Sequence, residues 1–154
     1  MSEITLEAVK AKQAELAAMI AQLSATPAAT KLLVIQETEI ELKPGEHYAG
    51  QVLDENGELL HHLVLMAEQP SEDLSWDAAM KWAESVGGSL PTRQEQALLF
   101  ANCKPHIKPE WHWSSEVYES NASSAWDCYF DYGYQFYGLK PAEGSARAVR
   151  RLDS

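Results

Sequence analysis

The stretch from Ser89 to Cys103 constrains the fold most, because it encodes a strand end, a rigid turn and a helix start within a few residues. Pro91 restricts the backbone at the turn. Thr92 and Glu95 have the spacing of a capping box, in which each side chain accepts a hydrogen bond from a backbone N–H at the start of a helix. The pattern therefore predicts that a helix begins directly after Thr92.

A second short helix is predicted just upstream of this turn. Its apolar residues follow the i, i+3, i+4, i+7 spacing of one helix face, at Trp76, Ala79, Met80 and Ala83. Ser75 is the expected N-cap, and Gly87–Gly88 the expected stop. Two short helices thus flank the turn at Pro91.

The first 26 residues have the pattern of an oligomerisation helix that ends at Thr26–Pro27. Its a and d positions, spaced as in a coiled coil, are Leu6, Val9, Gln13, Leu16, Ile20 and Leu23. A seam of fewer than about four heptads also fits a single amphipathic helix packed on its own domain. We favour self-association, because an isolated helix of this length is marginal in water and a polar a residue such as Gln13 sets register. We expect a homo-oligomer, with a trimer favoured over a dimer.

Residues 27–42 are expected to form a linker followed by a strand, because Lys31–Leu42 alternates apolar and polar side chains. Pro44–Gly45 is expected to turn the chain. These patterns divide the sequence into an oligomerisation helix (1–26), a linker and strand (27–42) and a folded α+β domain (43–154).

Two strands of this domain, Tyr48–Glu55 and Glu58–Met66, are predicted to form a hairpin. Asn56–Gly57 lies between them and is the preferred pair for a two-residue type I′ turn. The end of the second strand, His62–Met66, is apolar on both faces, which places this strand in the centre of a sheet.

The C-terminal third is predicted to consist of strands. Trp111–Tyr118 is one strand, Ala125–Gly138 is a hairpin that turns near Tyr132–Gly133, and Ala146–Leu152 is a closing strand whose arginines require carboxylate partners. Alternation in the hairpin directs one set of side chains into the core, namely Trp126, Cys128 and Phe130. It directs the other set, Asp127, Tyr129 and Asp131, toward solvent.

Composition excludes several classes of function. A net charge of −11 argues against direct binding of nucleic acid and of anionic membrane surfaces, both of which require clustered Lys and Arg. The sequence has no apolar stretch long enough to insert into a membrane and no signal-peptide pattern, so we expect cytoplasmic synthesis. Cys103 and Cys128 lack the spacing of a metal or redox pair and are expected to be buried thiols.

No pattern in the sequence indicates an enzyme, a metal site or a cofactor. His61, His62, His106 and His112 lack carboxylates at ligand spacing, and neighbouring His61 and His62 on a strand point to opposite faces. No nucleophile with a base and no phosphate-binding glycine loop is present. We expect a non-enzymatic protein with no cofactor and no metal.

The order of four short motifs resembles a bacterial and phage domain-of-unknown-function family, which includes the C-terminal domain of some collagen-like adhesins. The motifs are Leu90–Arg93, Trp113–Ser115, Ala125–Trp126 and Arg147–Arg150, and the resemblance covers residues 43 to 152. It implies a C-type lectin-like fold, related in shape to phage variable receptor-binding proteins and to formylglycine-generating enzymes. In this fold two short helices flank a small, twisted, mainly antiparallel sheet, and ligands bind at the last strands.

The same resemblance argues against two activities of related proteins. Calcium-dependent lectins carry acidic and amide ligands where this chain has Trp113–Ser115 and Ala125–Cys128, so no calcium site is implied. Formylglycine-generating enzymes use a pair of cysteines, whereas Cys103 lies at a helix end and Cys128 on an expected core face.

Most tyrosines of the chain lie between residues 118 and 137, among Ser, Asn and Asp, which is the composition of binding surfaces. Trp113, Trp126 and Phe130 are assigned to the core. The expected ligand-binding residues are Tyr118, Asn121, Asp127, Tyr129, Asp131, Tyr132, Tyr134 and Tyr137.

We therefore expect a phage or prophage binding module, incorporated into a virion, that recognises a protein or glycan through its C-terminal sheet face. The alternative is an acidic intracellular regulator or anti-defence protein that occupies a basic, nucleic-acid-binding surface of a host protein, which the net charge of −11 favours.

Overall fold

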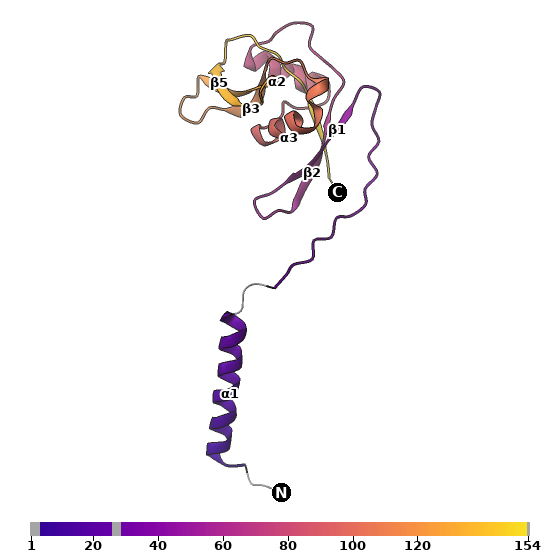
Figure 1. Cartoon of the computed structure of the whole chain (residues 1–154). Helices are drawn as coiled ribbons and strands as arrows, with labels where there is room; N and C mark the ends of the chain where they lie inside the picture. Colours follow the sequence, from indigo (N-terminus) through magenta and orange to yellow (C-terminus); the bar gives the residue numbers. More distant parts are fainter. Residues whose placement is uncertain (1–3, 26–28, 154) are drawn as a thin grey trace. The chain divides into compact units, whose positions relative to one another are not determined.

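The computed structural model describes residues 4–25 and 29–153 of the chain. Residues up to Glu37 and residues from Thr38 onward form two separate units. The first unit contains α1 (Leu6–Ala25), a single helix that covers the predicted seam (Figure 1). All six seam side chains are exposed. The predicted helix end at Thr26–Pro27 lies outside the described residues.

Residues 31–42 do not form the predicted strand. Alternating side chains indicate an extended backbone, but a strand also needs a neighbour that bonds its N–H and C=O groups. No described strand pairs with this segment. The four apolar side chains Leu32–Ile35 are between 68% and 88% exposed. Burial in a core therefore does not determine which way these side chains point either. The predicted turn at Pro44–Gly45 is present.

The second unit is an α+β domain, as predicted, and its first sheet contains β1 (His47–Leu53), β2 (Leu59–Leu65) and β6 (Val149–Leu152). The strands are antiparallel in the order β1-β2-β6, which confirms the central position of β2. Residues 63–65 of β2 are fully buried on both faces. The last strand of the chain therefore returns to the first hairpin.

The turn of this hairpin differs from the prediction. A type I′ turn needs positive φ at two central residues, but only Gly57 has positive φ here, +79°. The Gly57 N–H donates to the Asp54 carbonyl, and the Asp54 N–H donates to the Glu58 carbonyl. The Asp54 side chain also accepts from the backbone N–H groups of Asn56 and Glu58, so it starts the turn earlier than the Asn-Gly pair predicts.

Both predicted helices are confirmed. α2 (Trp76–Ser85) begins after Ser75, whose hydroxyl accepts from the Ala78 N–H, and it ends before Gly87, which has a φ of +85°. α3 (Arg93–Cys103) begins after Thr92 and is followed by a 3₁₀ turn, η1 (Lys104–His106).

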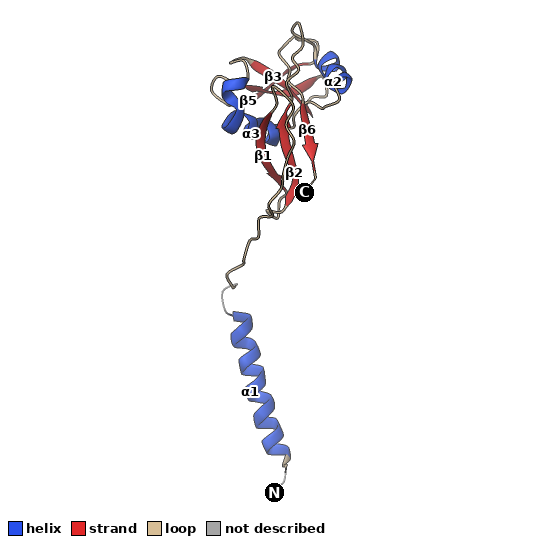
Figure 2. Cartoon of the chain, turned by 90° about the vertical axis from the view of Figure 1, so that its right-hand side faces the viewer, coloured by secondary structure: helices blue, strands red, loops and turns tan. Residues whose placement is uncertain are grey.

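The second sheet contains β3 (Trp111–Val117), β4 (Ser124–Tyr129) and β5 (Gln135–Leu139), antiparallel in this order. Figure 2 shows α2 and α3 on opposite sides of the strands. Two buried clusters match this arrangement: Leu99 of α3 packs in one, and Ala79 and Ala83 of α2 pack in the other. Cys103 and Cys128 are free and buried, as predicted.

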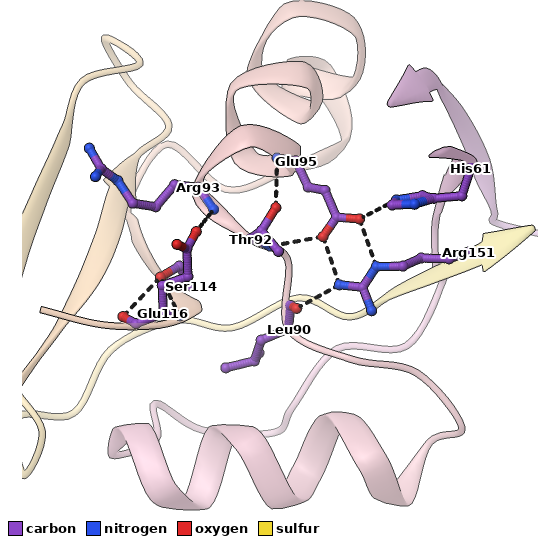
Figure 3. A network of polar contacts seen from close by, with 8 residues as sticks. All are labelled: His61, Leu90, Thr92, Arg93, Glu95, Ser114, Glu116 and Arg151. Atoms are coloured by element: carbon purple, nitrogen blue, oxygen red, sulfur yellow. Dashed lines mark hydrogen bonds and ion pairs between the residues drawn. The ribbon is translucent and has the colours of Figure 1, made fainter. Parts of the chain in front are cut away.

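The capping box at Thr92 is complete and joins a larger polar network (Figure 3). The Thr92 hydroxyl accepts from the Glu95 N–H, and the Glu95 carboxylate accepts from the Thr92 N–H at 2.8 Å. The same carboxylate accepts two hydrogen bonds of 2.7 Å from Arg151 of β6 and lies 2.8 Å from His61 Nε2 of β2. The start of α3 is thereby fixed to two strands of the first sheet.

The N-cap of α3 is expected to contribute to the stability of the fold. Thr92→Ala is expected to lower the free energy of unfolding by about 1 kcal/mol, because the Glu95 N–H loses its side-chain acceptor. Thr92→Ser keeps the hydroxyl and is the matched control. Urea unfolding followed by circular dichroism measures the difference, and equal stability of the two variants would contradict the role of the cap.

Candidate functional site

Four aromatic side chains of the second sheet form one surface group, which we call the aromatic stack: Tyr118, Trp126, Phe136 and Tyr137. The Tyr118 and Tyr137 rings are parallel, with centroids 3.9 Å apart. Phe136 stacks on Tyr137 at 4.8 Å. Trp126 meets Tyr118 and Tyr137 edge-on, at 5.2 and 5.8 Å. The stack combines half-buried rings with exposed ones, since Phe136 is 52% exposed.

Backbone pairing places these rings together. In the β4–β5 register, Trp126 lies directly opposite Tyr137, so their side chains share one face of the sheet. Tyr118 follows β3 and reaches the same place because its N–H donates to the Ser124 carbonyl, closing the turn that leads into β4. The turn and the two strands therefore build the stack.

Arg93, the first residue of α3, covers the Trp126 ring with its guanidinium carbon 3.5 Å from the ring centroid. Its Nε donates to the Gln135 side chain at 2.9 Å. Its backbone N–H donates to Glu116 (Figure 3). The indole N–H of Trp126 donates to Glu119, and this hydrogen bond lowers the pKa of the Glu119 carboxyl. The tryptophan is thus held by a cation above its ring and an anion at its edge.

A second pair of tyrosines lies near the β4–β5 turn. Tyr129 and Tyr134 stack with centroids 4.9 Å apart. Tyr132, in the turn between them, is 80% exposed. Burial, followed by the nearby Asp127, raises the pKa of Tyr129. Because Tyr129 and Trp126 differ by an odd number of positions on β4, the two tyrosine groups belong to opposite faces of the strand.

Two of the predicted polar site residues have roles in turns. The Asn121 side chain accepts from the Ser123 N–H, and the Asp131 side chain accepts from the Tyr132 N–H. These bonds fix the loops that carry Tyr118 and Tyr132.

The prediction that Asp127 lies on an exposed face is wrong. Its side chain is only 3% exposed and its Oδ1 has no hydrogen-bond partner. Burial raises its pKa to about 6. The reason is that this face of β4 also enters a core: Trp113, which pairs with Asp127 in the register, and Ala125 are fully buried with residues of α2. Asp127 therefore cannot contact a ligand directly.

The predicted core role of Trp126 is also wrong, whereas Trp113 and Phe130 are buried as predicted. Trp126 is half-buried: neither buried cluster includes it, and its ring contacts Arg93, Tyr118 and Tyr137 instead. The sequence prediction also omitted Arg93 and Phe136 from the site. Alternation gave no signal for Phe136, because the register pairs it with Asp127 on the other face, and only the structure shows its ring stacked on Tyr137.

No group of three or more His, Cys, Asp or Glu side chains within residues 4–25 and 29–153 is arranged to hold a metal ion. The histidines have other contacts: His61 bonds Glu95, His47 stacks on His106 at 3.5 Å, and His112 Nδ1 lies 2.9 Å from the Glu110 carbonyl. None of the helices that the structure describes is long and apolar enough to cross a membrane.

No protein-family model matches the chain, and a search of curated proteins found no match.

The buried Asp127 carboxyl is expected to make the stability of the fold depend on pH. Its folded pKa of about 6 lies above its ordinary value of 3.8, so the ionised form destabilises the fold. Stability should therefore fall as pH rises from about 4 to about 6 and stay lower above that range. Asp127→Asn should be more stable than the wild type at pH 7, by on the order of 1 to 3 kcal/mol, and should lose this advantage near pH 4.

Thermal and urea unfolding of both proteins at several pH values measures the effect. Asp131→Asn, which changes the same type of side chain in the adjacent turn, is the control. An advantage of Asp127→Asn that persists unchanged at pH 4 would show that ionisation is not its cause.

Proposed function

We propose that this chain is a non-enzymatic binding module that recognises a protein or glycan through the aromatic stack on its second sheet. The observation that carries the proposal is the exposure of clustered aromatic rings that neither buried core includes. Clustered exposed apolar surface is uncommon on soluble domains and marks sites of interaction. Tyrosine and arginine, both present here, are the residues that most often dominate binding energy.

The geometry of the stack favours a protein partner over a single sugar ring. Tyr137 stacks with both Tyr118 and Phe136, so stacking within the group occupies much of its ring faces. The ring edges and the exposed face of Phe136 remain for a partner. A surface of this kind suits broad contact with apolar and polar groups, as protein interfaces provide.

We also propose the C-type lectin-like fold for residues 43–154. The support is the order of elements: a hairpin, two helices, a three-stranded sheet and a last strand that returns to the hairpin. The aromatic stack lies on the late strands of this arrangement, where the resemblance places ligands. Function still has to be argued from the surface, because one fold hosts many activities.

The helix α1 is proposed to be the oligomerisation element, as a coiled coil with a trimer favoured over a dimer. Its support is the row of exposed apolar side chains along a helix that is otherwise rich in Ala, Glu, Lys and Gln. An isolated helix of this length gains little from propensity alone. Burial of the seam against other copies would supply the missing stabilisation.

The binding proposal is tested by replacing the central tyrosines. Wild-type protein is used to capture partners from bacterial lysate and to screen a glycan array, and the Kd of each purified hit is then measured. The variant Tyr118→Ala/Tyr137→Ala should lose at least about 2 kcal/mol of binding free energy, which is roughly a 30-fold weaker Kd.

The matched control is Leu53→Ala/Leu60→Ala, which removes exposed apolar groups from the first sheet. It should bind like the wild type, and circular dichroism should show that both variants fold. Unchanged binding by the tyrosine variant, or an equal loss in the leucine variant, would contradict recognition through the stack.

The oligomer is tested by light scattering of the intact protein and of a fragment that lacks residues 1–26. The intact protein should have the mass of a trimer or dimer, and the fragment should be a folded monomer. Leu16→Asp places a charge in the seam and should dissociate the oligomer. Ala18→Asp places the same charge on the opposite side of α1 and should leave the mass unchanged. A monomeric intact protein contradicts the proposal.

A further inference from the structure

A polar cavity of about 270 Å³ lies in the domain away from the aromatic stack. Four parts of the chain line it: the loop that follows β2, Lys108 between η1 and β3, His112 of β3, and the residues that precede β6. The charged or polar lining residues are Gln69, Ser71, Glu72, Asp73, Lys108, His112, Ser145 and Arg147. The cavity shares no residue with the stack, and its volume suits a small molecule rather than a polymer.

Arg147 gives this cavity an unusual electrostatic character. The side chain is only 6% exposed, and its two terminal nitrogens donate to the carbonyls of His106 and Met66 at 2.7 and 2.8 Å. Its Nε is buried without a partner. In the part of the chain that the structure describes, no carboxylate lies within ion-pair distance of this guanidinium.

The other two arginines of this segment show the contrast. Arg150 pairs with Glu46 at 2.8 Å, and Arg151 pairs with Glu95 at 2.7 Å. Glu68 acts on Arg147 electrostatically but does not lie within ion-pair distance. A buried cation without a paired anion is costly, because carbonyl dipoles replace only part of its hydration. The Arg147 charge is therefore available to stabilise an anion in the cavity, with exposed Lys108 as a second cation in the lining.

A simple anion does not match the whole cavity, because Glu72 and Asp73 also line it. Ser145 Oγ donates to Glu110 at 2.8 Å and lies 3.5 Å from Asp73 Oδ1, so carboxylates approach the cavity from two segments. These groups would repel a second negative charge and attract a positive one. The lining thus presents both signs of charge within one small volume.

His112 adds a neutral hydrogen-bonding group. Burial lowers its pKa to about 4, so the ring is uncharged near neutral pH. Its Nδ1 lies 2.9 Å from the Glu110 carbonyl, which can only accept, and therefore carries the proton. The other nitrogen, Nε2, is consequently an acceptor for a ligand N–H or O–H.

We propose that this cavity binds a small zwitterion of the free α-amino acid class, with the carboxylate toward Arg147 and Lys108 and the ammonium toward Asp73 and Glu72. The charges complement each other in pairs, so neither set of protein side chains is left beside a like charge. This site is independent of the proposed recognition surface.

The test uses intact protein and the standard L-amino acids, examined one at a time by isothermal titration calorimetry. At least one is expected to bind with a Kd of about 1 mM or tighter. For the tightest ligand, the N-acetyl derivative removes the positive charge and the amide removes the negative charge. Each derivative should bind at least about tenfold more weakly, because a charge-assisted hydrogen bond contributes more than about 1.4 kcal/mol.

Replacement of lining residues tests whether the amino acid binds in this cavity. Arg147 joins two walls through its carbonyl contacts and its replacement would disturb the fold, so exposed Lys108→Gln and Asp73→Asn are used instead. Each should weaken amino-acid binding about tenfold. Lys81→Gln, an exposed lysine of α2 outside the cavity, should leave the Kd unchanged. Thermal unfolding without ligand checks that all three variants keep their structure.

Three outcomes would overturn the proposal: no binding by any amino acid, equal binding of the N-acetyl or amide derivative, or a Kd that Lys108→Gln and Asp73→Asn leave unchanged. Binding that is lost with either charge of the ligand and with either variant supports it.

Discussion

One buried carboxylate, that of Glu95, fixes the position of α3 against the first sheet. It accepts from the Thr92 backbone and from two nitrogens of Arg151, and it lies against His61 (Figure 3). Burial alone would raise the pKa of Glu95, but these partners together hold it below its ordinary value. A buried charge with complete partners of this kind is costly to disturb, since loss of one partner leaves the other uncompensated.

The position of the candidate site depends on these contacts of Glu95. Glu95 points into the first sheet, while Arg93, two residues earlier on α3, reaches the second sheet and covers Trp126. Gln135 strengthens the link, because its side chain accepts from Arg93 Nε and donates to the Arg93 carbonyl. The first turn of one short helix therefore connects both sheets, and the aromatic stack is held by the same turn that the capping box starts.

The starts of α2 and α3 and the stop of α2 were predicted correctly from local signals, whereas the failed predictions for residues 31–42, Asp127 and Trp126 depended on long-range packing. The Thr92–Glu95 cap and the Gly87 stop each depend on residues a few positions apart, and both are present. The alternation of residues 31–42 specified an extended chain but not a pairing partner. Alternation in β4 separated its two faces, but it could not show that both enter a core, which buries Asp127, or that Trp126 stays half-buried outside both clusters. The cavity beside Arg147 is lined by segments that are distant in the sequence, so no local sequence pattern predicts it.

Two sets of exposed apolar side chains lie outside the core of the domain. Its two buried clusters are formed without the seam of α1 and without the exposed rings of the stack. The proposed contacts with other molecules would account for such side chains in a chain with a net charge of −11. The two sets also complement each other, because self-association through α1 would present several copies of the stack at once. Several weak contacts made together would give an apparent affinity well above that of one contact, so a modest aromatic surface would be sufficient for the proposed recognition.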